Sequence, residues 1–181
     1  GDESSQTGVM THSLRALRCN PPIPSTRNFL ASHAGFDSIP KGHITSVVDA
    51  DGAVRTVPPL ICVDDRPYPS LVISALLRSV HPSGAKIAEL TGDGGGPLAS
   101  VEPGKGLFAP HYNIRLSEFP GITIPVDDHG LMRISYSRVP SAYQVVSAVD
   151  VVRGRVEADM LDGTWVLVGA TAFGLGDVVP T

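Results

Sequence analysis

Residues 47–59 read VVDADGAVRTVPP, in which Asp51-Gly52 separates two runs rich in β-branched residues. An Asp-Gly pair between two such runs is the strongest short-range signal for a β-hairpin. Gly52 can adopt the positive φ that the turn requires, because it has no Cβ atom. We therefore predict a hairpin at this point, with Asp51 and Gly52 as its two-residue loop.

The predicted register decides which side chains meet across this hairpin. With a two-residue loop, Asp49 faces Val54 and Arg55 faces Val48. Successive side chains of a strand point to opposite faces, so Asp49 and Arg55 fall on different faces of the ribbon. We therefore expect that these two residues do not pair, and that each finds another partner or a ligand across the sheet.

A second stretch, PVDDHGLMRISYS at 125–137, repeats the pattern V-D-x-x-G-x-x-R. A calcium-binding EF-hand loop needs oxygen ligands at positions 1, 3, 5 and 12, with Gly at position 6. Neither stretch supplies the carboxylate at position 12. We therefore predict two β-hairpins with glycine turns, at Asp51-Gly52 and His129-Gly130, without a metal; weak calcium binding by a pair of carboxylates is the alternative. The repeated residues are Val48, Asp49, Gly52 and Arg55, and then Val126, Asp127, Gly130 and Arg133.

The rest of the chain predicts short strands and helices. The segment at 68–80 is apolar on most sides and predicts a buried helix with Pro69 in its first turn. Ser147 and Asp150 match a capping box that opens a short helix. The unbroken apolar run TWVLVGA at 164–170 is typical of a strand buried on both faces. Further predicted elements are a helix at 27–36 and strands at 85–90, 111–116, 122–126 and 131–137.

Together these elements indicate an α/β or α+β fold: a mixed sheet with β-hairpins and a buried C-terminal strand, with helices packed on it. The 181 residues suffice for one domain, with residues 1–25 as an irregular lead-in. The composition is 42% hydrophobic and 18% charged, with 19 Gly and 16 Pro, which predicts a folded but loop-rich chain. A net charge of −4 without a basic stripe excludes a nucleic-acid binder.

The two cysteines, Cys19 and Cys62, can form at most one disulfide. No spacing in the sequence brings them together, so the pattern favours two separate buried thiols, with a disulfide as the alternative. Without a C-x-x-C pair, a structural zinc site of the usual spacing is excluded. The polar start GDESSQTG does not resemble a signal peptide, and no apolar run is long enough to span a membrane.

No enzymatic motif withstands inspection. The glycine-rich stretch at 91–97 lacks the Lys-Ser/Thr pair of a phosphate-binding loop, and Pro97 prevents the helix that a dinucleotide fingerprint needs. The six histidines form neither H-x-x-x-H nor H-E-x-x-H. There is no G-x-S-x-G elbow either. We therefore predict no catalytic residue, no cofactor and no metal site.

Four blocks, taken in order, resemble the CHASE-type sensory domain of the second class (cyclase/histidine-kinase-associated sensory extracellular domain). They cover roughly residues 35–181, while the N- and C-terminal parts of the family domain are not visible. The blocks are AGFDSIPKGHITSVVDADGAVRTVPPLICVDDRPYPSLVISAL, DHGLMRISYS, VVSAVDVVRG and MLDGTWVLVGATAFGLGDVVPT. The positions that match family motifs with a structural role are Asp49, Asp51, Gly52, Gly130, Ser147 and Gly169.

The resemblance implies an extracytoplasmic, periplasmic or extracellular input domain of a membrane-bound bacterial signalling protein. The output of such proteins is an adenylate or diguanylate cyclase, a histidine kinase or a Ser/Thr kinase. It also implies flanking transmembrane helices and, as partner, an unknown small molecule or an extracytoplasmic protein. The domain itself would not be an enzyme, although its parent protein would be.

A ligand crevice is expected beyond the carboxyl end of the predicted strand at 164–170, as in open α/β sheets. The alternative is that the glycines there only make a turn. Two further function classes stay open, a ligand-free dimerisation or interaction module (a homodimer included) and a hydrolase fragment. The candidate ligand-binding residues are Thr171, Gly174, Gly176 and Asp177 in this exit, together with Arg55 and Arg133.

Overall fold

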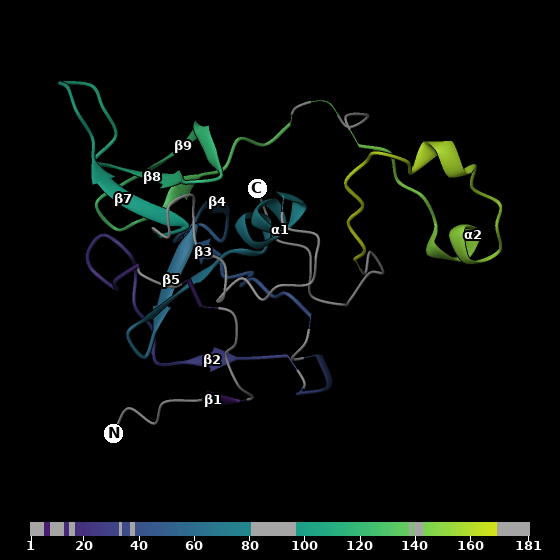
Figure 1. Ribbon diagram of the computed structural model, residues 1–181, viewed down its shortest axis with the longest axis horizontal. Helices are drawn as coiled ribbons and strands as arrows, with labels where there is room; N and C mark the ends of the chain where they lie inside the picture. Colours follow the sequence, from purple (N-terminus) through teal and green to yellow (C-terminus); the bar gives the residue numbers. More distant parts are fainter. Residues whose placement is uncertain are drawn as a thin grey trace.

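Short strands dominate the computed structural model of the protein (Figure 1). It describes residues 6–7, 13–14, 17–32, 34–36, 39–80, 97–137, 139 and 143–169. The strands are β1 (Gln6–Thr7), β2 (Phe29–Leu30), β3 (Val47–Val48), β4 (Val54–Val57), β5 (Leu60–Val63), β6 (Arg66–Pro69), β7 (Ala99–Pro103), β8 (Tyr112–Leu116), β9 (Phe119–Val126) and β10 (Met132–Arg133). The helices are α1 (Leu71–Val80) and α2 (Ala148–Val152), with 3-10 turns η1 (Ala34–Phe36) and η5 (Ala158–Met160).

The described strands form two three-stranded and two two-stranded sheets. The three-stranded sheets have the orders β10-β4-β3 and β7-β8-β9, and both are antiparallel. Strands β5 and β6 form an antiparallel pair, whereas β1 and β2 are parallel. The mixture of strands with two helices confirms an α+β fold built on β-hairpins.

Strand β5 is the element buried on both faces. Leu60 and Cys62 point into the main core, which also contains residues of α1 and of the β7-β8-β9 sheet. The alternate residues Ile61 and Val63 join a second cluster with Tyr68 of β6. A strand covered on both sides requires an unbroken apolar run, and LICV is such a run.

Helix α1 packs on this core through one face. Ile73 and Leu77, one turn apart, are buried there, and the side chain of Leu77 is 0% exposed. Ser74 is also buried, and its hydroxyl donates to the Lys41 carbonyl at 2.8 Å. The predicted helix is confirmed, but Val72 is exposed and Pro69 belongs to β6, so the helix is shorter and more one-sided than expected.

The helix predicted at 27–36 is wrong. Phe29 and Leu30 form β2, and among the described residues of this range only 34–36 are helical, as a 3-10 turn. The hydroxyl of Thr26 accepts the Asn28 N–H and donates to the Asn28 carbonyl, both at 3.1 Å. A local bond of this kind competes with helical hydrogen bonds, which explains why the apolar spacing did not lead to a helix.

The buried C-terminal strand predicted at 164–170 is also corrected. Residues 164–169 belong to no strand, and the side chains of Leu167 and Val168 are 88% and 89% exposed. The described part of the chain places no strand beside this segment, and an apolar run becomes a buried strand only where partner strands receive it. In Figure 1 it lies beside α2, in a lobe (residues 143–169) apart from the sheets.

Some predicted elements fall outside the described residues or change length. The strand expected at 85–90 lies outside them. Strand β9 begins earlier than the predicted 122–126, whereas β10 has only two residues of the predicted 131–137. No helix of the described residues combines the length and apolar character needed to cross a membrane.

Candidate functional site

The first V-D-x-x-G-x-x-R stretch forms the predicted hairpin with a longer loop. The Asp49 N–H donates to the Ala53 carbonyl at 2.8 Å, and the Gly52 N–H donates to the Asp49 carbonyl at 2.9 Å. The loop between Asp49 and Ala53 therefore has three residues, of which Gly52 has a φ of +84°. Three-residue loops with a residue of positive φ at this place are a common hairpin type.

The longer loop changes which side chains meet. Val48 pairs with Val54 and Val47 with Thr56, so Arg55 is the extra residue of a β-bulge. Arg55 then binds Asp49 at 2.7 Å and Asp51 at 2.7 Å. The expectation that Asp49 and Arg55 do not pair is wrong, because the bulge removes the alternation on which it rested.

The ion pairs among Asp49, Asp51 and Arg55 stabilise the charged forms of Asp51 and Arg55 and so shift their pKa values. The hydrogen bonds from Arg55, with a further one from the Ala53 N–H, lower the pKa of Asp51 to about 2. The same carboxylate, with Asp49, raises the pKa of Arg55. The three charged side chains satisfy one another. Arg55, which we predicted as a ligand contact, thus stabilises the turn through its two ion pairs.

The second V-D-x-x-G-x-x-R stretch makes the same kind of turn but connects strands of different sheets. The Asp127 N–H donates to the Leu131 carbonyl and the Gly130 N–H to the Asp127 carbonyl, both at 3.1 Å. Gly130 has a φ of +74°. The hairpin predicted here is wrong. The first turn joins two paired strands of one sheet, whereas this turn leads from β9 in one three-stranded sheet to β10 in the other.

The structure brings the two candidate arginines onto neighbouring strands. Arg133 of β10 lies opposite Thr56 of β4, and the next residue, Ile134, donates its N–H to the Arg55 carbonyl at 2.9 Å. Arg55 and Arg133 are thus one residue out of register. Both side chains are exposed, and Arg55 is already bound to two carboxylates.

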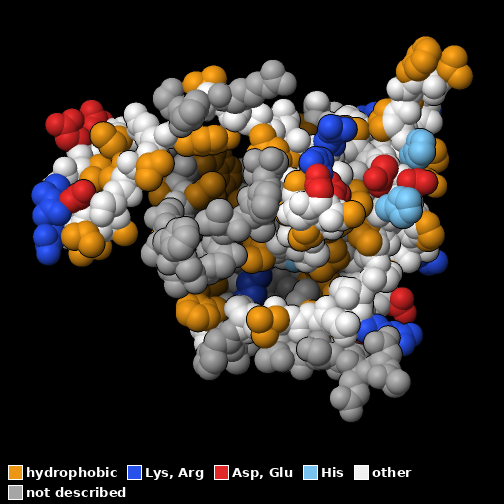
Figure 2. Space-filling model, turned by 180° about the vertical axis from the view of Figure 1, so that it is seen from behind, with side chains coloured by type: hydrophobic (Ala, Val, Ile, Leu, Met, Phe, Trp, Pro, Cys, Tyr) orange, Lys and Arg blue, Asp and Glu red, His pale blue; other side chains and the backbone are white. Residues whose placement is uncertain are grey.

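Histidine and acidic side chains gather at the second turn (Figure 2). Nδ1 of His129 lies 2.8 Å from a carboxylate oxygen of Asp128, and Nδ1 of His111 lies 3.9 Å from the same atom. Asp127, Asp128 and His129 present possible ligand atoms within 4.8 Å of one another. One oxygen of Asp127 already accepts the N–H groups of His129 and Leu131, so the turn itself explains the arrangement.

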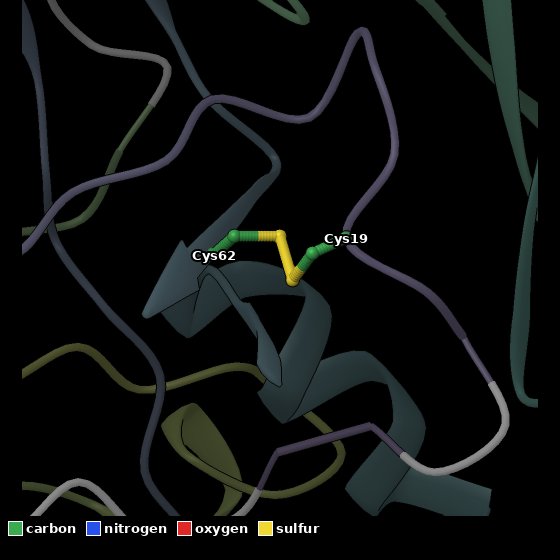
Figure 3. Close-up of a disulfide and its surroundings, with 2 residues drawn as sticks. All are labelled: Cys19 and Cys62. Carbon is green, nitrogen blue, oxygen red and sulfur yellow. A yellow bond between two sulfur atoms is a disulfide. The ribbon is translucent and has the colours of Figure 1, made fainter. Parts of the chain in front are cut away.

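The cysteines are bonded, which corrects the favoured prediction of two separate thiols. Cys19 and Cys62 form a disulfide with Cα atoms 5.8 Å apart, next to α1 (Figure 3). The bond attaches residues 19–26, here called the strap, to β5. The Cys62 N–H donates to the Pro24 carbonyl at 2.8 Å, and the Thr26 N–H donates to the Cys62 carbonyl at 2.9 Å. The strap lacks regular secondary structure, yet it is fixed on the core.

A cavity of about 410 Å³ opens beside this attachment. Its lining comes from residues 25–27 at and directly after the end of the strap, from β5, and from the turn that joins β5 to β6. Charges of both signs are present in the lining, which none of the sequence motifs indicated. The lining residues are Ser25, Thr26, Arg27, Cys62, Asp64 and Asp65.

A second cavity, of about 270 Å³, lies on the β7-β8-β9 sheet. It is lined mainly by proline, serine and leucine, and its one charged residue, Arg115, pairs with Glu102 at 3.3 Å. Because that pairing engages the arginine, this cavity offers a ligand fewer charged contacts than the cavity beside the strap.

His43 is a titratable residue half-buried where the chain meets α1. Its N–H donates to the Pro69 carbonyl at 3.0 Å, and its carbonyl accepts the Leu71 N–H at 2.8 Å. Nδ1 accepts the Thr45 N–H at 3.3 Å, whereas Nε2 is buried without a hydrogen-bond partner among the described residues. Burial lowers the pKa of His43 to about 4, against a raising influence of the Pro59 carbonyl.

The remaining predicted residues come from the C-terminal part of the sequence. Thr171, Gly174, Gly176 and Asp177 lie outside the described residues. Ser147 stands at the N-cap of α2 as predicted, but its side chain makes no capping bond. Asp150 instead accepts from Nε of Arg155 at 2.7 Å, which explains why the capping box does not close. Gly169 lies in the exposed segment.

The lobe presents many apolar side chains to solvent, seen beside charged groups at one end of Figure 2. No residue of α2 is buried, and the side chain of Trp165 is 67% exposed. Further exposed apolar residues are Tyr143, Val145, Val149, Val151, Val152, Met160, Val166, Leu167 and Val168. Monomeric proteins rarely leave large contiguous apolar areas uncovered, so this surface is a candidate for contact with another molecule.

The protein-family model of the CHASE2 domain matches residues 12–181 of the chain. No curated protein and no solved structure matches the chain. The match covers most of the chain and confirms the resemblance described above. CHASE2 domains are sensory rather than catalytic, and they lie outside the cytoplasm in membrane proteins. The chain therefore belongs to the CHASE2 domain family, the extracellular sensory domains of signalling proteins.

Proposed function

We propose that this domain is the extracytoplasmic input module of a membrane-bound bacterial signalling protein whose output is a cyclase or a kinase. The observation that carries the proposal is the Cys19–Cys62 disulfide, added to the family match. Disulfides form and persist outside the reducing cytoplasm. Here the bond joins the strap to β5, and Cys62 is part of the main core. An oxidising location, which allows this bond to form, would therefore stabilise the folded core.

Signalling requires that a ligand or partner bind two conformations with unequal affinity. Two segments of this domain suit such a role because they join separate parts of the fold. The strap connects the N-terminal region to β5, and the turn at Asp127–Leu131 connects the two three-stranded sheets. A molecule that moves either segment relative to the core would alter the positions of both sheets.

Thr171, Gly174, Gly176 and Asp177 remain proposed contacts of this response. Their place in the sequence, after an apolar segment and among glycines, favours a role in conformation rather than in turnover. We expect Asp177→Asn to alter the response of the parent protein to its signal. Hydrolytic turnover by the isolated domain that is lost in Asp177→Asn would contradict this assignment and support a hydrolase fragment.

A ligand-free dimerisation module is the second candidate function. It is favoured by the exposed apolar side chains of the lobe, because an interface between two copies would remove them from water. Sedimentation of the isolated domain separates the two candidates. A stable dimer whose parent protein responds to no small molecule supports the second, whereas a monomer with a saturable ligand supports the first.

The location is tested in cells that produce the parent protein. Exposed Leu107 is replaced by Cys, and a membrane-impermeant maleimide is added from outside. Labelling of this Cys in intact cells is expected, without labelling of a Cys placed in the output domain. Labelling only after lysis would overturn the proposal. The parent sequence provides a second test, since apolar runs of about 20 residues should flank the domain and lead to a cyclase or kinase.

A further inference from the structure

The cavity beside the disulfide has two walls that differ in charge. One wall contains Ser25 and Thr26, which carry hydroxyl groups, from the end of the strap, and Arg27, which follows the strap directly. The β5–β6 turn contributes the acidic residues Asp64 and Asp65. A volume of about 410 Å³ lies in the range of small-molecule sites in proteins. The lining therefore offers a ligand one basic and two acidic residues, from two separate segments of the chain.

Both walls are held in place without a ligand. The strap is fixed to β5 by the disulfide and by the two backbone hydrogen bonds of Cys62. Asp64 and Asp65 form the two-residue turn between Val63 and Arg66, which are paired across the hairpin. Their φ values are 47° and 58°, the conformation of a tight hairpin turn. Binding would not have to order these segments, which removes one of the usual costs of association.

The charged groups differ in how far they are already satisfied. Within the described part of the chain, no ion pair joins Asp64 or Asp65 to a basic side chain, in contrast to Asp49 and Asp51 in the neighbouring hairpin. Two carboxylates can accept hydrogen bonds from an ammonium group. Arg27 has interactions of its own, but a guanidinium carries five N–H donors and can bind a carboxylate while keeping other contacts.

We propose that this cavity binds a small zwitterion of the amino-acid class, with its ammonium at Asp64 and Asp65 and its carboxylate at Arg27. The inference deepens the proposed sensory function, on which it rests. The bound molecule would join the strap to the β5–β6 hairpin. Any change in the strap would then pass to the turn at Gly130, which lies against Pro22 of the strap.

The experiment is titration calorimetry on the oxidised domain with the twenty protein L-amino acids as probes. At least one should bind saturably with a millimolar or lower Kd. Its N-acetyl derivative, which lacks the ammonium, and its amide, which lacks the carboxylate, should each bind at least about tenfold more weakly, since tenfold corresponds to the loss of one modest charged contact. Binding of all three forms alike would overturn the proposal.

Variants of both walls identify the site. Arg27→Gln and the double variant Asp64→Asn/Asp65→Asn should each weaken binding at least about tenfold. Asn tolerates the positive φ of the turn as Asp does, so the double variant is expected to fold. Arg153→Gln and Asp162→Asn, in the exposed lobe, are the matched controls and should leave the Kd unchanged. Equal loss in wall and control variants would place binding elsewhere and overturn the proposal.

The outcomes separate this inference from the proposed function. If no amino acid binds at millimolar concentration while the domain is labelled outside the cell, the inference fails and the input module stands. If an amino acid binds at these walls but the domain lies in the cytoplasm, the binding site stands and the proposed function fails.

Discussion

Gly130 lies directly against the backbone carbonyl of Pro22, so that a Cβ atom at position 130 would overlap this oxygen and the ring of Pro24. The turn that joins the two three-stranded sheets is therefore seated on the strap that the disulfide holds. Gly52, at the matching place in the first turn, has only open space around it. The two copies of the motif thus differ in their surroundings: the glycine of the second copy is tightly packed, whereas the glycine of the first has open space around it.

This contrast predicts different effects of the same substitution. Gly130→Ala should lower the free energy of unfolding by about 2–4 kcal/mol, because it combines a strained positive φ with a steric overlap. Gly52→Ala has only the conformational strain and should cost about 1 kcal/mol. Urea unfolding of both variants measures the difference. Equal losses would mean that Gly130 does not pack on the strap.

Removal of the disulfide should destabilise the domain strongly. The bond closes a loop with a sequence separation of 43 residues, and Cys62 is part of the main core. The double variant Cys19→Ala/Cys62→Ala should lose about 2–5 kcal/mol of unfolding free energy. Dithiothreitol should lower the Tm of the domain without substitutions and leave the Tm of the double variant unchanged. If dithiothreitol does not change the Tm of the domain without substitutions, the disulfide is absent or does not stabilise the fold.

The ion pairs that stabilise the first turn can be followed through one carboxyl group. Arg55 holds the pKa of Asp51 at about 2. In Arg55→Gln the charged donor is lost, and the pKa of Asp51 should rise towards the ordinary value of about 4. Carbon-detected NMR titration of the carboxyl group gives both values. Arg133→Gln, on the neighbouring strand, is the control and should leave this pKa low.

His43 should make stability depend on pH. Its pKa is lowered from 6.5 to about 4 in the folded protein, so the unfolded chain takes up the proton first as the pH falls. The free energy of unfolding should be highest above pH 6.5 and should decrease until the pH reaches about 4. Partial exposure reduces the size of the effect, to about 1–2 kcal/mol.

The measurement for His43 is urea unfolding at neutral pH and near pH 4, in the parent domain and in His43→Gln. The variant should lose this part of the pH dependence. His111→Gln, which changes an exposed histidine, should keep it. If the unfolding free energy depends on pH in the same way in His43→Gln and in the domain without substitutions, another group is responsible.

Two substitutions test where the core lies. Leu77 is 0% exposed, and Leu77→Ala should cost about 2–5 kcal/mol. Val168 is 89% exposed, and Val168→Asp should change the unfolding free energy by no more than about 0.5 kcal/mol. Equilibrium unfolding gives both values. A loss of several kcal/mol in Val168→Asp would support the buried C-terminal strand that the sequence pattern predicts.

The local features were predictable where a few adjacent residues decide them. Asp51-Gly52 and His129-Gly130 make turns because glycine adopts a positive φ without strain, and α1 forms where apolar residues recur at helical spacing. The number of residues in the first loop was not predictable from the dipeptide alone. It depends on the bulge at Arg55, which in turn decides whether Arg55 meets Asp49.

Features that depend on distant segments could not be read from the sequence. The Cys19–Cys62 bond requires that the strap lie along β5, and no local pattern indicates this. The same holds for the strand that is buried on both faces. Residues 60–63 (β5) and 164–169 are both apolar runs, and only the neighbouring elements decide that β5 is the buried one. The cavity beside the strap was missed because its two walls, Ser25–Arg27 and Asp64–Asp65, are far apart in the sequence and become adjacent only where the strap lies along β5.

The disulfide also determines how mechanical tension passes through the domain. A pull on the N-terminal side of Cys19 crosses the sulfur bridge and reaches β5 without stretching the intervening residues. The β3–β4 hairpin, which lies within the bridged loop, is therefore shielded from such a load. The load falls instead on the β5–β6 hairpin and on α1, which follow Cys62 in the chain.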